Sequence, residues 1–286
     1  MKDSGYLRHI RACNQWNPGH FREFFVQGQR VGHLKPVMWE ALAQWPDLFE
    51  IGPRTVHLTP ELEDFRARTR ALAKVTESLI EQGVISHRHG EQYPVTASGR
   101  ERAYATIDRT AAPYFGLRAY GQHMNGYVRS GEEIMLWIAR RSADRRNFPN
   151  KLDNMVAGGL PQELGLMENL LKECGEEASI PPEIANRAKP VGALTYCKET
   201  AVGLKPDTLY CYDLELPEDF KPSNADGEVA EFQLMPLDEV ARIVRETDDF
   251  KLNCNLVIID FLIRHGNLGP DNPDYLEIVQ GLHEWL

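Results

Sequence analysis

The segment most informative about the fold begins Gly158-Gly159-Leu160-Pro161 and continues to Lys172-Glu173-Cys174-Gly175-Glu176-Glu177. Apolar residues recur at helical spacing through its second part and predict a helix from Met167 to Ala178. A strand is expected after this helix, from Val191 to Thr195. A glycine pair before a helix allows its backbone to come close to a ligand or to the helix itself. The stretch therefore predicts a glycine segment that faces one amphipathic helix.

Three carboxylates of this helix, Glu173, Glu176 and Glu177, are three and four positions apart and so share one face. Most glutamate clusters of this kind are simply solvated. Here the glycine pair and an apolar stripe on the same helix favour a binding site instead. The stripe consists of Met167, Leu170, Leu171 and Cys174. Since hard divalent cations take oxygen ligands, we expect the three glutamates to bind Mg²⁺, with Mn²⁺ as a substitute.

Counted from Gly158, the stretch resembles the Nudix box, Gly-x5-Glu-x7-Arg-Glu-U-x-Glu-Glu-x-Gly-U, where U is a bulky apolar residue. The glutamate cluster and the apolar slots are in register. Three slots depart: Leu164 stands for the first Glu, Lys172 for Arg and Ser179 for the last Gly. Lys172 keeps the positive charge but lacks the planar fork of arginine. The metal-binding half of the box is therefore retained, while the first Glu contact is missing.

A closer resemblance is to the thiamin pyrophosphokinase-related Nudix proteins of plants, fungi and bacteria. Three segments carry it: residues 151–161, residues 168–174 and residues 24–36. The resemblance implies an α/β fold, a Nudix α/β/α sandwich with a mixed sheet, preceded by a smaller α+β domain. The expected division is an accessory domain at 1–115 and a Nudix hydrolase domain at 116–286.

This resemblance also implies a reaction, the hydrolysis of thiamin diphosphate or its oxy and oxo analogues to the monophosphate and phosphate. Metal ions on Glu173, Glu176 and Glu177 would clamp the diphosphate, and a carboxylate would take a proton from the attacking water. We expect that base to be Glu173 or Glu231, with Glu228 as the next choice for a late-strand carboxylate. Lys172 is expected to assist.

Recognition of the organic part of the substrate calls for aromatic walls. Trp137, Tyr210 and Phe232 lie on predicted strands and are the candidates, together with Tyr212. Core packing is the competing interpretation for each. Gly158 and Gly159 are expected to contact the substrate through their backbone.

The composition limits the other possibilities. The net charge of −10 over 286 residues argues against a nucleic-acid binder. No apolar run is long enough to span a membrane, and the five cysteines are scattered without a Cys-x-x-Cys pair. No apolar segment follows Met1–Gly5, so we expect a cytoplasmic protein. A homodimer is left open.

Two other functions stay open. The fold hosts many substrates, so the enzyme could act on nucleoside diphosphate derivatives such as ADP-ribose or a dinucleotide. The altered box slots also allow a non-catalytic binding protein on a Nudix scaffold.

The N-terminal part reads as a β-hairpin over 21–34 and a long helix that starts at Thr59-Pro60 and ends before Gly83. A short strand over 93–96 and a helical stretch over 99–107 follow.

Overall fold

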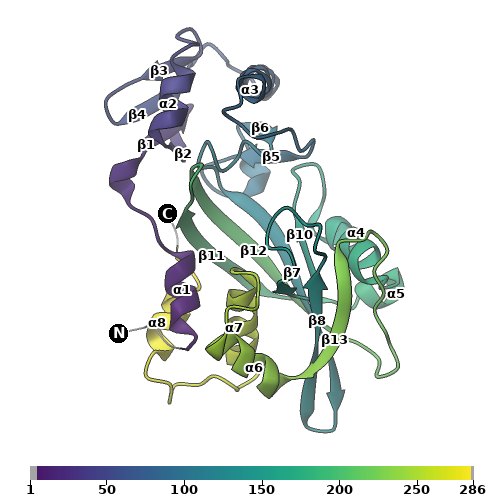
Figure 1. The fold of residues 1–286 in the computed structure, drawn as a ribbon. Helices are drawn as coiled ribbons and strands as arrows, with labels where there is room; N and C mark the ends of the chain where they lie inside the picture. Colours follow the sequence, from purple (N-terminus) through teal and green to yellow (C-terminus); the bar gives the residue numbers. More distant parts are fainter. Residues whose placement is uncertain (1–4, 285–286) are drawn as a thin grey trace.

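The computed structural model describes residues 5–284, which form three β-sheets (Figure 1). The first sheet has the strand order β2-β1-β4-β3, and a second, two-stranded sheet pairs β5 with β6. The elements of this half are α1 (Leu7–Cys13), η1 (Pro18–His20), β1 (Arg22–Val26), β2 (Gln29–Leu34), α2 (Pro36–Leu42), β3 (Phe49–Ile51), β4 (Thr55–Leu58), α3 (Phe65–Glu81), β5 (Gln92–Val95), η2 (Arg100–Arg102) and β6 (Ala105–Asp108).

The third sheet is the largest and has the order β11-β12-β7-β8-β13, with β10 paired to β7 and β9 paired to β8. It is mixed, because β12 and β7 run parallel while β7 and β8 run antiparallel. Its strands are β7 (Ala119–Ser130), β8 (Glu133–Arg141), β9 (Leu152–Asp153), β10 (Val156–Gly159), β11 (Lys189–Glu199), β12 (Leu204–Glu215) and β13 (Val229–Pro236). Along one edge of β7, the first part of the strand pairs with β10 and the last part pairs with β8. The strands β10 and β8 therefore diverge from each other along this edge.

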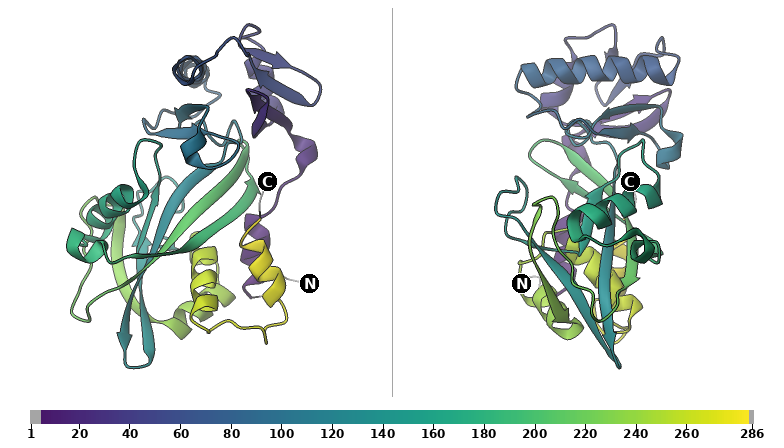
Figure 2. Two further views of the ribbon diagram at one scale, coloured as in Figure 1. Left: turned by 180° about the vertical axis from the view of Figure 1, so that it is seen from behind. Right: turned by 90° about the vertical axis from the view of Figure 1, so that its right-hand side faces the viewer.

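Helices cover both faces of this sheet (Figures 1 and 2). They are α4 (Leu166–Ala178) and α5 (Pro182–Ala185) on one face, and α6 (Leu237–Glu246), α7 (Cys254–Arg264) and α8 (Tyr275–Gly281) on the other. Side chains along each strand alternate between the two cores. On β12, Tyr210 and Tyr212 pack toward the α4 core, while Leu209 and Cys211 join the core under α7. The predicted α/β/α sandwich with a mixed sheet is confirmed.

A separate core lies in the N-terminal half, where residues such as Phe24, Leu72 and Phe115 are fully buried. Helix α1 does not join it. Instead, Leu7 and Ile10 pack into the core under α7, beside α8. The first helix of the chain therefore belongs by its packing to the C-terminal half, and the division at residue 115 stays a prediction.

Two predicted N-terminal elements differ from the structure. Helix α3 begins at Phe65 instead of near Thr59, because the Asp64 carboxylate accepts a hydrogen bond from the Ala67 N–H at 2.7 Å and caps the helix there. Thr59 stays extended, since its N–H donates to the Leu48 carbonyl at 2.8 Å. The helical stretch predicted over 99–107 is wrong: a short 3-10 turn leads into β6, whose residues pair with β5.

A buried ion-pair network joins the large sheet to α7. Asp153, only 4% exposed, accepts hydrogen bonds from Arg141 at 2.8 Å, Lys251 at 3.1 Å and the Cys254 thiol at 2.6 Å. Burial alone would raise its pKa, but Lys251 and its other neighbours outweigh burial and lower the pKa of Asp153 to about 2. The ionised Asp153 therefore stabilises the folded protein above about pH 4, and this contribution is lost as the pH falls toward 2.

Asp153→Asn should lower the free energy of unfolding by about 3–5 kcal/mol, because it leaves Lys251 and Arg141 buried without their counter-charge. Urea denaturation at pH 7 measures this change. Glu246→Gln is the matched control, because the Glu246 carboxylate pairs with Arg245 on an exposed face of α6 and its loss should leave the free energy of unfolding nearly unchanged. Equal effects of the two substitutions would contradict the assigned role of the network.

Candidate active site

Strand β10 lies at the centre of the predicted site. The Ala157 N–H donates a hydrogen bond of 2.7 Å to the Glu177 carboxylate. Next along the strand, a Cβ atom on Gly158 would lie 2.4 Å from the carboxyl carbon of Glu173, so a side chain there would displace that carboxylate. The glycine is therefore required by the close approach of α4 to β10, as the sequence predicted.

Helix α4 is fixed in this position by packing and by one buried amide. Leu170 and Cys174 are fully buried against the sheet. The Asn169 side chain donates to the Gly159 carbonyl at 3.0 Å and to the Gln122 side chain at 2.8 Å. Since Gln122 stands on β7, this amide ties helix, glycine strand and sheet together.

The three predicted metal ligands have different surroundings. Glu177 is 7% exposed, and burial raises its pKa to about 8. Burial also raises the pKa of Glu173, whereas Glu176 is exposed. Lys172 lies between the other two carboxylates, 3.3 Å from Glu173 and 2.8 Å from Glu176. The structure thus brings Glu173 and Glu177 to β10, with Glu176 on the outer side of the cluster.

The cluster consists of carboxylates, which are the ligands that a hard divalent cation prefers, but in residues 5–284 the ligand atoms of the three glutamates do not all lie within 4.8 Å of one another. A different group, His123, Asp153 and Cys254, is the one in residues 5–284 whose ligand atoms all lie within 4.8 Å of one another. There, Asp153 already binds Lys251 and Arg141, and burial keeps the pKa of the Cys254 thiol far above its usual range. We assign this group to the ion-pair network that supports the sheet.

Two of the residues that depart from the Nudix box, Ser179 and Leu164, have distinct structural roles. Ser179 ends α4 with a φ angle of 51°, the left-handed region that favours the glycine usual in this slot. Leu164, in the first Glu slot, lies in the loop before α4. Its carbonyl accepts a hydrogen bond of 2.9 Å from Arg100, a buried residue of the N-terminal half.

The N-terminal half also contacts the rest of this loop. The Gln162 N–H donates to the Gln92 carbonyl at 2.8 Å, and Arg100 donates to the carbonyls of Pro161 and Gln162. Sequence reasoning missed these contacts. No motif marks Arg100, because its role appears only when two segments 60 residues apart meet.

The two late-strand carboxylates lie on different sides of the sheet. Glu228 lines a narrow recess together with Glu177, Ala157 and Arg141, and it forms an ion pair with Arg145. Glu231, the first choice for the base, is opposite Arg140 and pairs with it at 2.7 Å. The register of β13 shifts between Val229 and Glu231, which turns Glu231 away from the recess. The geometry favours Glu228 over Glu231.

The candidate aromatic residues face the α4 side of the sheet. Trp137, Tyr210 and Phe232 are partly buried and pack against the core beneath α4. Phe232 is opposite Ala139, a residue that lines the recess. The Trp137 indole N–H is buried and has no hydrogen-bond partner in the described part of the chain. Packing is thus observed for all three, and Trp137 retains an unused donor.

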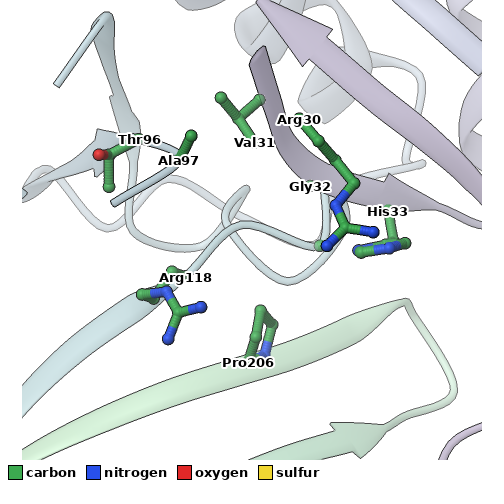
Figure 3. Close-up of a pocket in the computed structure, with 9 residues that line it drawn as sticks. Arg30, Val31, Gly32, His33, Thr96, Ala97, Arg118 and Pro206 are labelled. Atoms are coloured by element: carbon green, nitrogen blue, oxygen red, sulfur yellow. The ribbon is translucent and has the colours of Figure 1, made fainter. Parts of the chain in front are cut away.

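A second cavity lies between the N-terminal sheet and the large sheet (Figure 3). Arg30, His33, Arg118 and Thr96 are among the residues that line it. Burial lowers the pKa of His33 to about 4, so this imidazole is neutral at pH 7. None of the predicted site residues lines this cavity, so it is separate from the recess beside Glu177.

Comparison with known proteins establishes the family. The chain is 42% identical over 290 residues to Nudix hydrolase 20, chloroplastic, of Arabidopsis thaliana, across 98% of this chain and 78% of that protein. It is also 42% identical over 283 residues to Nudix hydrolase 24, chloroplastic, of the same plant, with the same coverage. The chain belongs to the Nudix hydrolase family. It is therefore a hydrolase of the pyrophosphohydrolase type, and enzymes of this family generally use divalent metal ions.

Two further comparisons concern parts of the chain. Residues 5–119 match the model of a domain described as a domain of unknown function (DUF4743). Among solved structures, an Ap4A hydrolase binary complex of C. elegans aligns with a TM-score of 0.39 and 14% identity, over 52% of this chain and 99% of that one.

The expected cytoplasmic location is contradicted by these relatives, because both Arabidopsis proteins are chloroplastic by name. The expectation rested on the absence of an apolar segment after Met1–Gly5, and such an absence does not report the compartment. Residues 1–4 of that segment lie outside the described part of the chain. Within residues 5–284, no helix has both the length and the apolar character needed to cross a membrane.

Gly158→Ala should lower hydrolase activity by about 10- to 100-fold while the protein stays folded, because the new methyl group displaces the Glu173 carboxylate from β10. Steady-state kinetics and circular dichroism measure the two effects. Gly175→Ala is the control on the same helix, where a Cβ meets nothing within 4 Å. If Gly158→Ala retained full activity, the contact between Gly158 and Glu173 would not matter for catalysis.

Proposed function

We propose that this Nudix hydrolase uses Mg²⁺ to cleave thiamin diphosphate or its oxy and oxo analogues, giving the monophosphate and phosphate. The observation that carries the proposal is the position of Glu177, which accepts a hydrogen bond from the backbone of β10 and lines the recess together with Glu228. The resemblance of residues 151–161 and 168–174 to the thiamin-related branch supports the choice of substrate.

Glu173, Glu176 and Glu177 would hold the metal, which supplies positive charge to the diphosphate when bound. Glu228 would take the proton of the attacking water, and its position in the recess beside Glu177 supports this role. Glu173 remains the alternative base. Lys172 offers a positive charge beside two of the carboxylates.

The organic part of the substrate would bind along the recess. A thiazolium ring is cationic, so the negative charge of Glu228 would attract it, and Phe232, whose strand partner Ala139 lines the recess, is the nearest candidate aromatic residue.

Phosphate release in the presence of Mg²⁺ tests the substrate, with thiamin diphosphate, its oxy analogue, ADP-ribose and a dinucleotide compared at equal concentration. We expect the thiamin compounds to be hydrolysed best. Glu177→Gln should reduce that turnover by more than about 100-fold, because a metal ligand contributes several kcal/mol to transition-state stabilisation.

The other outcomes separate the alternatives. Preference for ADP-ribose or the dinucleotide would keep the chemistry and replace the substrate. Folded protein that hydrolyses none of the four compounds would support a non-catalytic binding protein.

Metal binding should release a proton at neutral pH, because the raised pKa of Glu177, about 8, keeps that carboxyl group protonated before the metal binds. Affinity for Mn²⁺ should therefore rise about tenfold per pH unit up to about pH 8 and then level off. Calorimetry in two buffers with different ionisation enthalpies measures the protons released. A pH-independent affinity with no proton release would remove Glu177 from the ligand set.

A further inference from the structure

Gly159 follows Gly158 on β10 and also lies against polar side chains. These side chains, Tyr93 and Arg109, come from the N-terminal half of the chain. A Cβ atom on Gly159 would lie 2.4 Å from the Tyr93 hydroxyl and 2.7 Å from Nη1 of Arg109. The preceding residue, Gly158, makes the same kind of contact with Glu173. The Arg109 guanidinium and the Glu173 carboxylate thus lie against adjacent residues of one strand, whose Cβ directions point to opposite faces.

Arg109 is held in place by its own segment. Its Nη1 donates to the Glu91 carboxylate at 2.8 Å, and its backbone N–H donates to the Glu91 carbonyl at 2.9 Å. The guanidinium carbon lies 5.5 Å from the centre of the Tyr93 ring, and Tyr93 is 4% exposed. Because β5 and β6 pair just before Arg109, the backbone that carries it is part of a sheet.

Most of the hydrogen-bonding capacity of Arg109 is unused. A guanidinium carries five N–H donors, and within residues 5–284 the side chain of Arg109 makes one hydrogen bond, through Nη1 to Glu91. Its side chain is 36% exposed. The donors on Nη2 and Nε are therefore available to an acceptor from solvent.

The negative charge of the site calls for a cationic group that can bind phosphate. Carboxylates dominate it: Glu173, Glu176 and Glu177 on α4, with Glu91 close enough that its charge adds to the burial that raises the pKa of Glu173. A diphosphate brings further negative charge into this field. Lys172 is already shared between two glutamates, so Arg109 would add a second positive charge to that of the metal.

We propose that Arg109 binds the diphosphate of the substrate from the side of Gly159, opposite the carboxylates of α4, and so acts as a positioning residue supplied by the N-terminal half. A planar guanidinium suits this role, because it donates two parallel hydrogen bonds to one phosphate group. The inference rests on the proposed function, which requires a diphosphate at the glutamate cluster. It assigns the N-terminal half a direct part in substrate binding.

Arg109→Ala should raise KM for the diphosphate substrate by about 10- to 100-fold with a much smaller change in kcat, since charge-assisted hydrogen bonds to the phosphate are lost. The KM of Arg109→Lys should lie between those of Arg109→Ala and the wild type, because lysine keeps the positive charge but lacks the planar fork of arginine. Arg88→Ala is the matched control. Arg88 is a nearby exposed arginine that pairs with Glu77, so its removal should leave KM unchanged.

Binding of methylenediphosphonate in the presence of Mg²⁺, measured by calorimetry, provides a readout that needs no turnover. Its affinity should fall in Arg109→Ala, while the affinity for Mn²⁺ alone stays at the wild-type value. Unchanged KM and unchanged methylenediphosphonate affinity in a folded Arg109→Ala protein would overturn the proposal. If Arg109→Ala does not fold, the same two measurements on Arg109→Lys decide it, and wild-type values there would also overturn it.

Failure of the proposed function is recognised separately. A wild-type protein that hydrolyses none of the thiamin compounds, yet binds methylenediphosphonate in an Arg109-dependent way, would disprove the substrate and support the role of Arg109.

Discussion

The close approach of α4 to β10 is the constraint on which the rest of the site depends. Glu173 can reach the strand because Gly158 has no side chain, and Glu177 replaces a backbone partner for the Ala157 N–H. Both contacts require the helix to lie flat against the glycine strand. The buried side chains of Leu170 and Cys174 supply the apolar contact that holds it there, at a position where the sheet divides between β10 and β8.

This arrangement explains why the carboxylates of one helix differ. Glu177 points inward, where burial disfavours its charge, while Glu176 one position before it is exposed and pairs with Lys172. A cation beside Glu177 would remove the cost of burying that charge. Ionisation of this buried carboxyl group is unfavourable without such a cation, so the fold would couple the ionisation of Glu177 to metal binding at the proposed site.

The features that could be predicted from the sequence are those that depend on the spacing of nearby residues. The helix, its glutamate face and the requirement for glycine at Gly158 follow from residues close together in the chain, and all three appear in the structure. The choice between Glu228 and Glu231 could not be made in this way, because it depends on a shift of register in β13. Arg100 and Arg109 carried no signal, since their contacts with the loop and with Gly159 cross from one half of the chain to the other.

The contacts of Arg100 also bear on the altered box. In this chain Leu164 replaces the first Glu, so the loop before α4 lacks the carboxylate that the motif normally supplies. The buried guanidinium of Arg100 instead donates hydrogen bonds to the carbonyls of Pro161, Gln162 and Leu164, and the Gln92 carbonyl accepts one from the Gln162 N–H. Together with the hydrogen bond from the Gln162 side chain to the Arg100 carbonyl, these contacts order the loop that leads into α4. The altered motif and the N-terminal half are therefore connected. Leu164 lies in the loop before α4, and the N-terminal half supplies hydrogen-bond partners to the backbone of that loop.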